Sequence, residues 1–374
     1  MAAENLRRVK VDGAILRSKV RWSAEGEKPT KYFCSLENRQ YVNKTIYKIA
    51  KNDKIITEQD QILQEQRAYY ESLYSSKRGR ENISDSDFFK DYENIPKLNA
   101  EESQKLEGVL TIQECTEALK SMSNNKSPGS DGFPPEFYKM FWGTLGKFVT
   151  RSLNHAFQSG EYSITQKQGV ITCLPKQNKD RQLLKNWRPI TLLNTDYKIA
   201  STVLATRMKN VLPNIIHENQ KGFLKGRFIG ENTRLVYDLL SYANVKNIPG
   251  LTLLLDFEKA FDSIEWDYML KTLKYFKFGE NVCKWVEISY RNINSCVINN
   301  GHFSQFFNLH RGVRQGDPLS PYLFITAVEL LAASIRRFPH VKGFNINQKE
   351  FLLGQYADDS FLLLDGSQRS LQEV

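Results

Sequence analysis

The spacing of apolar residues predicts helices along much of the chain. Ile62, Tyr69 and Leu73 recur at helical intervals within residues 61–74. Thr111 followed by Glu114 is a capping-box pattern, which predicts a helix that begins directly after Thr111. Proline suits the first turn of a helix and glycine suits its end, so a helix is expected between Pro135 and Gly160. Two more are expected over residues 196–212 and 319–335.

Shorter apolar runs predict strands. Residues 169–175 are rich in β-branched residues, and residues 251–257 form a nearly continuous apolar run that predicts a buried strand. Asn299-Asn300-Gly301 separates two further runs and is typical of a hairpin turn. Asp358-Asp359 separates Leu352-Leu353 from the apolar run that starts at Phe361, which predicts a hairpin with both carboxylates at its tip.

The first third of the chain reads as two segments. Residues 1–75 are expected to be a helical N-terminal extension. Residues 76–109 are expected to be an acidic linker, since residues 85–107 hold seven Asp and Glu against three Lys. Lys77-Arg78-Gly79-Arg80 is only a short basic run, which is weak support for a nuclear location.

Composition excludes several classes of protein. The chain has 374 residues, of which 41% are hydrophobic and 25% charged, as in ordinary globular proteins. Its five cysteines include no C-x-x-C pair, so neither a zinc ribbon nor a secreted disulfide framework is predicted, and a reducing, intracellular compartment is expected. Pro321 and Glu329 interrupt the longest apolar region, which therefore predicts a core helix and no membrane partner.

Charge is concentrated in one stretch. The net charge is +10, and residues 166–234 hold 13 Lys and Arg against 4 Asp and Glu. The same stretch carries Trp187, Tyr197, Phe223 and Phe228, a mixture that suits phosphates and stacked bases. A solvated basic face would have the same composition.

Three aspartates follow or separate the apolar runs. Asp256 ends the run that begins at Leu251, and Asp358 and Asp359 lie at the tip of the expected hairpin. Clustered carboxylates repel one another unless a cation neutralises them, and hard divalent ions prefer such oxygen ligands. Two Mg²⁺ ions roughly 4 Å apart stabilise the attacking and leaving oxygens of a phosphoryl transfer. Asp358-Asp359 alone is equally typical of a surface turn.

Six motifs, in order, resemble those of reverse transcriptases, most closely the non-LTR (LINE-type) retrotransposon group. They are Leu174-Pro175-Lys176, Asn186-Trp187-Arg188-Pro189-Ile190, Gln220-Lys221-Gly222-Phe223, Leu255 to Asp262, Arg314 to Pro321 and Tyr356-Ala357-Asp358-Asp359. The resemblance runs from about Leu110 to the end of the chain. It implies an α+β fold of right-hand architecture, with helical fingers over residues 110–245 and a ferredoxin-like antiparallel palm over residues 246–374.

The resemblance also implies roles for individual residues. Asp256, Asp358 and Asp359 match the family's metal-binding triad, with the carbonyl of Phe257 as a further ligand of two Mg²⁺ ions, for which Mn²⁺ could substitute. The implied reaction adds a deoxynucleotide from a dNTP to a DNA primer on an RNA template. Phe261 matches the family's steric gate against the ribose 2′-hydroxyl.

The remaining motifs match positions around the nucleotide and the template. Lys176 and Arg188 resemble the fingers cations that grip the triphosphate, a task that suits these two side chains. Gln315 and Gly316 resemble the palm residues beneath the nucleotide. Gln220, Gly222 and Phe223 resemble a motif near the template strand.

The chain departs from the family pattern at its end. Val374 follows Asp359 by only fifteen residues, so the resemblance implies a C-terminally truncated chain without a thumb and without an endonuclease domain. An inactive fragment that binds RNA or RNA–DNA hybrid without turnover is therefore the alternative. A group II intron maturase or a viral RNA polymerase is a further alternative, and Phe261 disfavours the viral one.

Overall fold

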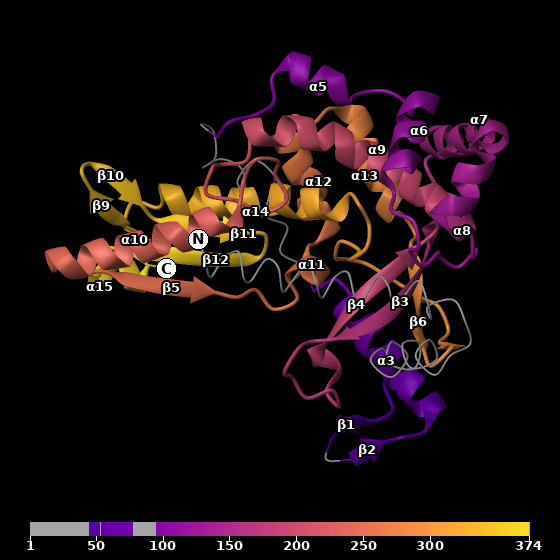
Figure 1. The fold of residues 1–374 in the computed structure, drawn as a ribbon, viewed down its shortest axis with the longest axis horizontal. Helices are drawn as coiled ribbons and strands as arrows, with labels where there is room; N and C mark the ends of the chain where they lie inside the picture. The colour runs from indigo at the N-terminus through magenta and orange to yellow at the C-terminus, as the bar shows by residue number, and fades with distance from the viewer. Residues whose placement is uncertain (1–44, 53, 78–94, 374) are drawn as a thin grey trace, which may run out of the picture. The chain divides into compact units, whose positions relative to one another are not determined.

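A computed structural model describes residues 45–52, 54–77 and 95–373. Most of the expected N-terminal extension and much of the expected acidic linker lie outside these residues. The chain divides into two compact units (Figure 1). The small unit comprises Met1–Gln66, Thr172–Pro189 and Ile298–Ser304, and the large unit comprises Arg67–Ile171, Ile190–Val297 and Gln305–Val374. The expected domain boundaries at residues 75, 109 and 245 are not tested by this division and stay predictions.

Three separate segments build the small unit. Strands β1 (Ile49–Lys51) and β2 (Lys54–Ile56) pair antiparallel, and helix α3 (Gln59–Leu73) begins in this unit. The backbone amide of Ile46 donates to the side chain of Asn299 at 2.9 Å, and the Asn299 amide donates back to the Ile46 carbonyl at 3.0 Å. This exchange joins two segments that are 253 residues apart in the sequence.

A five-stranded sheet has the order β4-β3-β6-β7, with β8 also paired to β6. Its strands are β3 (Gln168–Pro175), β4 (Trp187–Leu193), β6 (Asn294–Asn299), β7 (His302–Phe303) and β8 (Phe307–Asn308), and a 3₁₀ turn, Leu184–Asn186, precedes β4. Asn299 pairs with His302, and Asn300 and Gly301 between them have φ of 53° and 76°. The predicted hairpin is confirmed, because two successive left-handed residues form the turn that matches strand twist.

Apart from residues of β3 and β4, the part of the large unit that precedes β5 in the sequence is mainly helical. Its helical segments are α5 (Ala100–Leu106), α6 (Ile112–Ser121), α7 (Pro135–Ser159), α8 (Ile164–Lys167), α9 (Thr195–Val211), the 3₁₀ turn Leu212–Asn214, and α10 (Ile229–Lys246). Thr111 and Glu114 form the predicted capping box, and Gly160 ends α7 with φ of 81°. These predictions are confirmed because each depends on backbone groups within a few residues.

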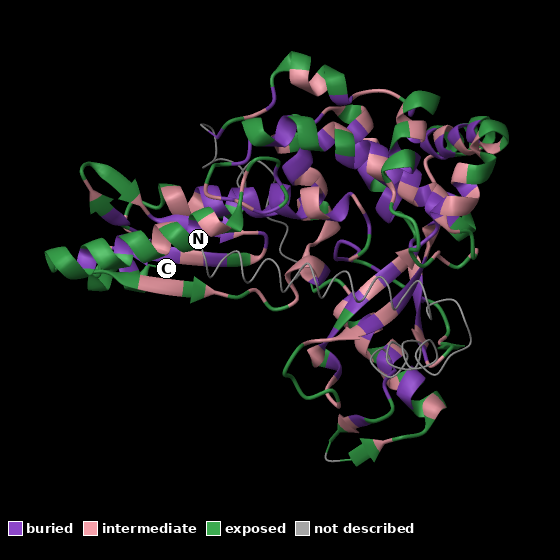
Figure 2. Ribbon diagram, in the orientation of Figure 1, coloured by how far each residue is buried: buried purple, intermediate pink, exposed green. Residues whose placement is uncertain are grey.

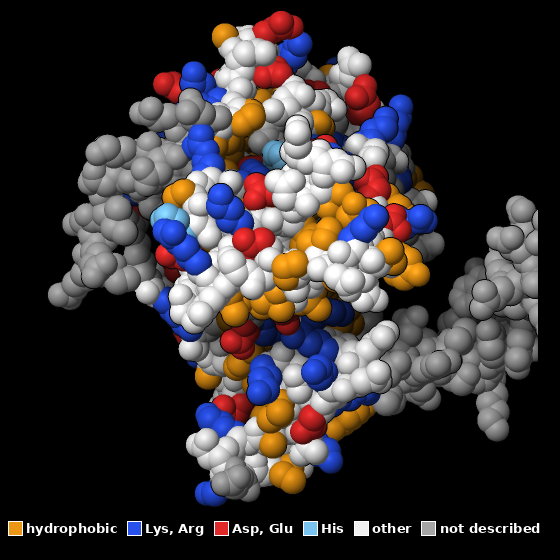
Figure 3. Space-filling model, turned by 90° about the vertical axis from the view of Figure 1, so that its left-hand side faces the viewer, with side chains coloured by type: hydrophobic (Ala, Val, Ile, Leu, Met, Phe, Trp, Pro, Cys, Tyr) orange, Lys and Arg blue, Asp and Glu red, His pale blue; other side chains and the backbone are white. Residues whose placement is uncertain are grey.

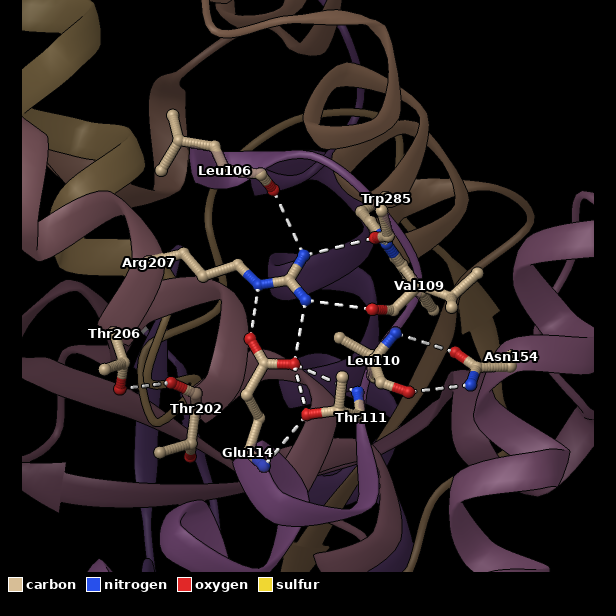
Figure 4. A network of polar contacts seen from close by, with 11 residues as sticks. Leu106, Val109, Leu110, Thr111, Glu114, Asn154, Thr202, Thr206, Arg207 and Trp285 are labelled. Atoms are coloured by element: carbon tan, nitrogen blue, oxygen red, sulfur yellow. Dashed lines mark hydrogen bonds and ion pairs between the residues drawn. The ribbon is translucent and has the colours of Figure 1, made fainter. Parts of the chain in front are cut away.

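Arg207 of α9 ties α6 and the loop before it to α9 (Figure 4). Its guanidinium donates to both carboxylate oxygens of Glu114, at 2.7 and 2.9 Å. It also donates to the carbonyls of Leu106, Gly108 and Val109 at 2.9 to 3.1 Å. Burial alone would raise the pKa of Glu114, but the hydrogen bonds from Arg207 and Thr111 outweigh it and lower that pKa.

The second half of the large unit is built around a three-stranded antiparallel sheet. Its order is β11-β12-β5, with bounds Leu353–Tyr356, Asp359–Leu364 and Leu251–Leu255. On one face Leu353, Leu362 and Leu364 pack with Ala332 of α14 (Ser320–Arg337). On the other face Leu363 packs with Leu239 and Ala243 of α10 and with Phe344. The remaining elements of this unit are α11 (Ala260–Ser263), α12 (Trp266–Tyr275), α13 (Glu280–Tyr290), the hairpin β9 (Phe344–Ile346) and β10 (Lys349–Phe351), and α15 (Gln368–Gln372).

Helix α14 confirms the core helix predicted over residues 319–335. Figure 2 shows it largely buried, with Leu323, Phe324 and Leu330 each at most 1% exposed. It begins at Ser320, with Pro321 in its first turn. Within the described ranges, no helix is long and apolar enough to cross a lipid bilayer.

The prediction that residues 251–257 form a buried strand is wrong. Strand β5 ends at Leu255, and Leu251 and Leu254 are 38% and 77% exposed. The physical reason is position, because β5 pairs with β12 on one side and is the last strand in the order of its sheet.

Figure 3 shows the side of the molecule on which α10 and β9 lie in Figure 1. Hydrophobic side chains gather there among charged ones.

Candidate active site

The sheet register of the large unit brings the aspartate-bearing segments together. Leu255, the last residue of β5, pairs with Ser360 of β12, and Tyr356 of β11 pairs with Asp359. The Leu255–Ser360 pair is the last pair of this ladder, and Asp256 directly follows Leu255 in the sequence while Asp359 directly precedes Ser360. Opposed residues of paired antiparallel strands have Cα atoms roughly 5 Å apart, so the ladder ends next to both aspartates. Asp358 occupies the two-residue turn between β11 and β12, so the expected hairpin tip is confirmed.

The chemistry of these side chains fits a hard divalent cation. Asp256 and Asp359 are exposed, and Asp358 is half-buried. Oxygen donors of this kind are the ligands that Mg²⁺ prefers. Within residues 45–52, 54–77 and 95–373, no group of three or more His, Cys, Asp or Glu is already arranged to hold a metal ion. The metal assignment therefore stays a prediction that rests on donor chemistry and register.

Phe261 lies between two other aromatic rings. On one side the Phe324 ring of α14 stacks on it, with centroids 4.2 Å apart and planes at 10°. On another side Phe223 meets it edge-on at 6.2 Å. Two aromatic neighbours leave the Phe261 ring few orientations, which is the property a steric gate requires. Phe257 lies between Asp256 and α11 and is half-buried.

Gln315 and Gly316 lie in the loop before α14. The carbonyl of Gln315 accepts a hydrogen bond from the amide of Thr191 at 2.7 Å. Gly316 has φ of 114°, and a Cβ there would lie 2.5 Å from the Thr191 carbonyl oxygen, so only glycine fits. The side-chain amide of Gln315 donates to both oxygens of Asp262, each at 3.2 Å.

Asp262 is a buried residue to which the sequence patterns assign no role. Its carboxylate accepts from the Tyr74 hydroxyl at 2.9 Å in addition to Gln315. Burial raises the pKa of Asp262 to about 6, and the Tyr74 hydroxyl, Lys259, Gln315 and Arg311 only partly offset this effect. No local pattern distinguishes Asp262, because Glu258, Lys259 and Ser263 beside it are polar as well.

A second buried acid, Asp317, fixes the same loop. It forms an ion pair with Arg314 at 3.7 Å and accepts hydrogen bonds from the hydroxyls of Tyr197 (2.7 Å) and Ser201. The Arg314 guanidinium also lies over the Tyr197 ring, 4.6 Å from its centroid. Both charged side chains are at most 1% exposed, so this pair stabilises the loop from within and is not a substrate contact.

The Gln220 motif lies against the aspartate hairpin. Gln220 is 2% exposed and Gly222 is buried, whereas Phe223 is 42% exposed. A Cβ at Gly222 would lie 2.5 Å from the amide nitrogen of Ala357, the residue before Asp358. Of the three residues expected near a template strand, Phe223 is thus the one that presents its side chain to solvent.

Lys176 and Arg188 belong to the small unit. The Lys176 amide donates to the Asn186 carbonyl at 2.8 Å, and the side chain of Arg188 is exposed. A pocket of about 510 Å³ is lined by Pro175, Lys176, Gln177, Asn178, Lys179 and Arg181, which include three cations and no carboxylate. The aspartates belong to the large unit.

Two of the four aromatic residues in the basic stretch cannot stack on bases as placed. Trp187 and Tyr197 are each 1% exposed, and the Trp187 ring nitrogen donates to the Arg181 carbonyl at 2.8 Å. Phe223 and Phe228 are 42% and 67% exposed. Stacking on bases therefore stays a prediction for Phe223 and Phe228 alone among these four residues.

The chain is similar in sequence to known proteins. Residues 174–374 match the family model described as reverse transcriptase (RNA-dependent DNA polymerase). The transposon TX1 uncharacterized 149 kDa protein of Xenopus laevis is 32% identical over 365 residues, which are 97% of this chain and 27% of that protein. The Pol polyprotein from type-1 retrotransposable element R2 of Nasonia vitripennis is 30% identical over 50% of this chain and 18% of its own length.

A solved structure of apo telomerase from Candida tropicalis, truncated from its C-terminal domain, is also similar. It has a TM-score of 0.41 and 14% identity, and the match covers 66% of this chain and 53% of that one. The chain spans about a quarter of the TX1 protein and less of the R2 polyprotein. The relatives named above are proteins of a transposon and of a retrotransposable element. Since the family model spans more than half of the sequence, the chain belongs to the reverse transcriptase (RNA-dependent DNA polymerase) family.

Proposed function

We propose that the chain carries the nucleotidyl-transfer site of an RNA-directed DNA polymerase. The observation that supports this proposal is the strand register, which ends at the Leu255–Ser360 pair, next to Asp256 and Asp359, with Asp358 in the adjoining turn. The substrates would be an RNA template, a DNA primer and dNTPs. The primer 3′-oxygen bonds to the α-phosphorus of the dNTP, the bond from that phosphorus to the β-phosphate oxygen breaks, pyrophosphate leaves, and the 3′-hydroxyl proton passes to solvent.

The chain's own residues would divide the work. Asp256, Asp358, Asp359 and the carbonyl of Phe257 would hold two Mg²⁺ ions. Such ions supply charge neutralisation and a lowered pKa of the attacking hydroxyl when bound. Lys176 and Arg188 would bind the triphosphate, since both are cations in a unit with a basic pocket.

Other residues would set the shape of the nucleotide site. Phe261, fixed by two aromatic neighbours, would exclude the ribose 2′-hydroxyl. Gln315, whose amide is oriented by Asp262, and Gly316 would lie beneath the nucleotide. Phe223 would contact the template, because it is the exposed member of its motif.

The proposed architecture is the right hand of polymerases. Residues 110–245 would form helical fingers and residues 246–374 a ferredoxin-like antiparallel palm. The antiparallel sheet β11-β12-β5 with α14 on one face supports the palm assignment.

The test is extension of a DNA primer on an RNA template by the purified chain, with Mg²⁺ and dNTPs. Asp358→Asn removes one carboxylate charge at the hairpin tip and should lower the extension rate by about 10³-fold, which corresponds to ~4 kcal/mol of transition-state stabilisation. The matched control is Asp238→Asn, an exposed aspartate of α10 that pairs with Arg234, and it should leave the rate unchanged.

The same assay separates the proposal from its alternative. If the chain binds RNA–DNA hybrid tightly but neither Mg²⁺ nor Mn²⁺ supports extension, the chain is a binding fragment without turnover. Equal extension rates for the wild type and Asp358→Asn would contradict the assignment of the site.

A further inference from the structure

The segment that contains Gln220 runs beside the end of β11. The amide of Gln355 donates to the carbonyl of Asn219 at 2.9 Å, and the amide of Lys221 donates to the carbonyl of Gln355 at 2.8 Å. Gln220 and Gln355 form a parallel bridge. Asn232 of α10 adds a side-chain bond to the same Gln355 carbonyl at 2.9 Å. Strand β11, which leads into the turn with Asp358, therefore has hydrogen-bonded neighbours on both sides, the segment around Gln220 and strand β12.

The side chain of Gln220 binds both backbone groups of Ala357. Its carbonyl oxygen accepts from the Ala357 amide at 2.8 Å, and its amide nitrogen donates to the Ala357 carbonyl at 3.2 Å. The same oxygen accepts from the amide of Gly222 at 2.8 Å. The carboxamide offers an acceptor and a donor side by side, whereas an ionised Glu has no donor and Leu has neither, so neither can replace this pair of bonds.

Ala357 has a backbone conformation that needs such support. Its φ is 56°, in the left-handed region, which costs an alanine roughly 1–2 kcal/mol. The residue is 5% exposed, and it is directly followed by Asp358. A strained backbone next to a functional side chain persists only where its surroundings determine it. Here the surroundings are Gln220 and the closely approaching Gly222.

We propose that Gln220 is a positioning residue, which holds Ala357 in the left-handed conformation and thereby fixes the direction of the Asp358 carboxylate. The proposal rests on the proposed metal role of Asp358. It gives the buried side chain of Gln220 a task that does not require contact with the template. Groups that orient metal ligands in this way typically change metal affinity by about 10- to 100-fold when removed.

Two measurements on the whole chain test the proposal. The first is Mn²⁺ affinity from electron paramagnetic resonance, and the second is hydrogen exchange of the peptides that cover residues 353–364. Gln220→Leu should weaken Mn²⁺ binding by about tenfold and speed exchange at the Ala357 amide. Gln220→Glu keeps the size of the side chain and its acceptor but loses the donor. It should also weaken Mn²⁺ binding and speed exchange at the Ala357 amide, and it replaces the Leu variant if that variant does not fold.

A second substitution distinguishes positioning from general stabilisation. Glycine adopts positive φ without strain, so in an Ala357→Gly background Gln220→Leu should weaken Mn²⁺ binding by less than about threefold. The control is Gln166→Leu, since Gln166 is also buried and donates to Asp196 at 2.8 Å. That variant should lower the free energy of unfolding and leave both Mn²⁺ affinity and exchange at residues 353–364 unchanged.

Each outcome decides the matter. Unchanged Ala357 exchange in Gln220→Leu, or an equal loss of Mn²⁺ affinity in both backgrounds, would overturn the positioning role while leaving the proposed reaction intact. A wild-type chain that binds no Mn²⁺ would overturn the metal site itself and with it the role of Gln220 toward Asp358, while hydrogen exchange would still report whether Gln220 holds the turn.

Discussion

Individual residues around Phe261 show how one buried carboxylate can organise several functional groups. Asp262 accepts from the Gln315 amide and from the Tyr74 hydroxyl, and so links the loop before α14 to the end of α3. Asp262 lies at the end of the motif Leu255 to Asp262. Its hydrogen-bond partners Tyr74 and Gln315, however, are 188 and 53 residues away in the sequence. Such long-range contacts are absent from any local pattern, which is why no role for Asp262 could be predicted.

The pKa of Asp262 predicts a dependence of stability on pH. Its value of about 6 in the folded chain lies above the ordinary value of 3.8, so the folded state binds more protons between these values and loses stability as pH rises. Asp262→Asn removes this loss. The free energy of unfolding of the wild type relative to Asp262→Asn should fall by roughly 1–1.5 kcal/mol between pH 5 and 7.5.

Urea denaturation of both proteins across this pH range measures the difference directly. An unchanged difference between pH 5 and 7.5 would mean that Asp262 titrates normally. The opposite sign would mean that Lys259 and Arg311 dominate over burial.

Phe261 makes a prediction about nucleotide choice. Phe261→Ala removes the ring that would collide with a 2′-hydroxyl, so the ratio of kcat/KM for dNTP over rNTP should fall by about tenfold or more, chiefly through better use of rNTP. Single-nucleotide extension with each nucleotide measures this ratio. Phe324→Leu is the informative partner, because it loosens the stacking neighbour while keeping Phe261, and it should erode the ratio less.

At the scale of elements, local signals predicted helix ends and tight turns, and long-range packing decided the rest. The α6 cap, the Pro135–Gly160 limits of α7 and the Asn300-Gly301 turn depend on neighbouring backbone groups. The exposure of β5 depends on which strand lies beside it. No sequence pattern above predicts α10, whose exposed side carries Tyr237, Leu240 and Val245, because apolar residues on both sides blur its periodicity.

The network around Arg207 makes a prediction about how elements are held together. Arg207→Ala leaves the partly buried Glu114 and three carbonyls without their donor, and should lower the free energy of unfolding by about 3 kcal/mol. Arg207→Lys should recover less than half of this loss, because an ammonium cannot reproduce the planar fork. Chemical denaturation measures both effects.

Arg234→Ala is the matched control for this network. Arg234 forms an ion pair with Asp238 one helical turn away, but its side chain is 77% exposed. The pair should contribute at most about 0.5 kcal/mol. Equal losses for Arg207→Ala and Arg234→Ala would show that the carbonyl contacts of Arg207 do not contribute to stability.

At the scale of the whole molecule, the motifs that carry the three aspartates lie on neighbouring strands of one sheet. Asp256 directly follows β5, which pairs with β12, and Asp358 and Asp359 lie between β11 and the second residue of β12, while the roles of these aspartates stay predictions. In the sequence, Lys176 and Arg188 and the aspartates belong to successive motifs of one series. In the structure, the two cations belong to the small unit and the aspartates to the large unit. Unit membership is a property of three-dimensional contact, so no linear composition shift marks it.

The discontinuous small unit has a consequence for synthesis on the ribosome. Ile46 exchanges hydrogen bonds with Asn299, which is translated 253 residues later. At roughly 5–20 residues per second, this partner emerges about 10–50 s after Ile46. During that interval the strands of the early segment have no native partner from residues 298–304, so the small unit completes its folding late and after a large loop has closed.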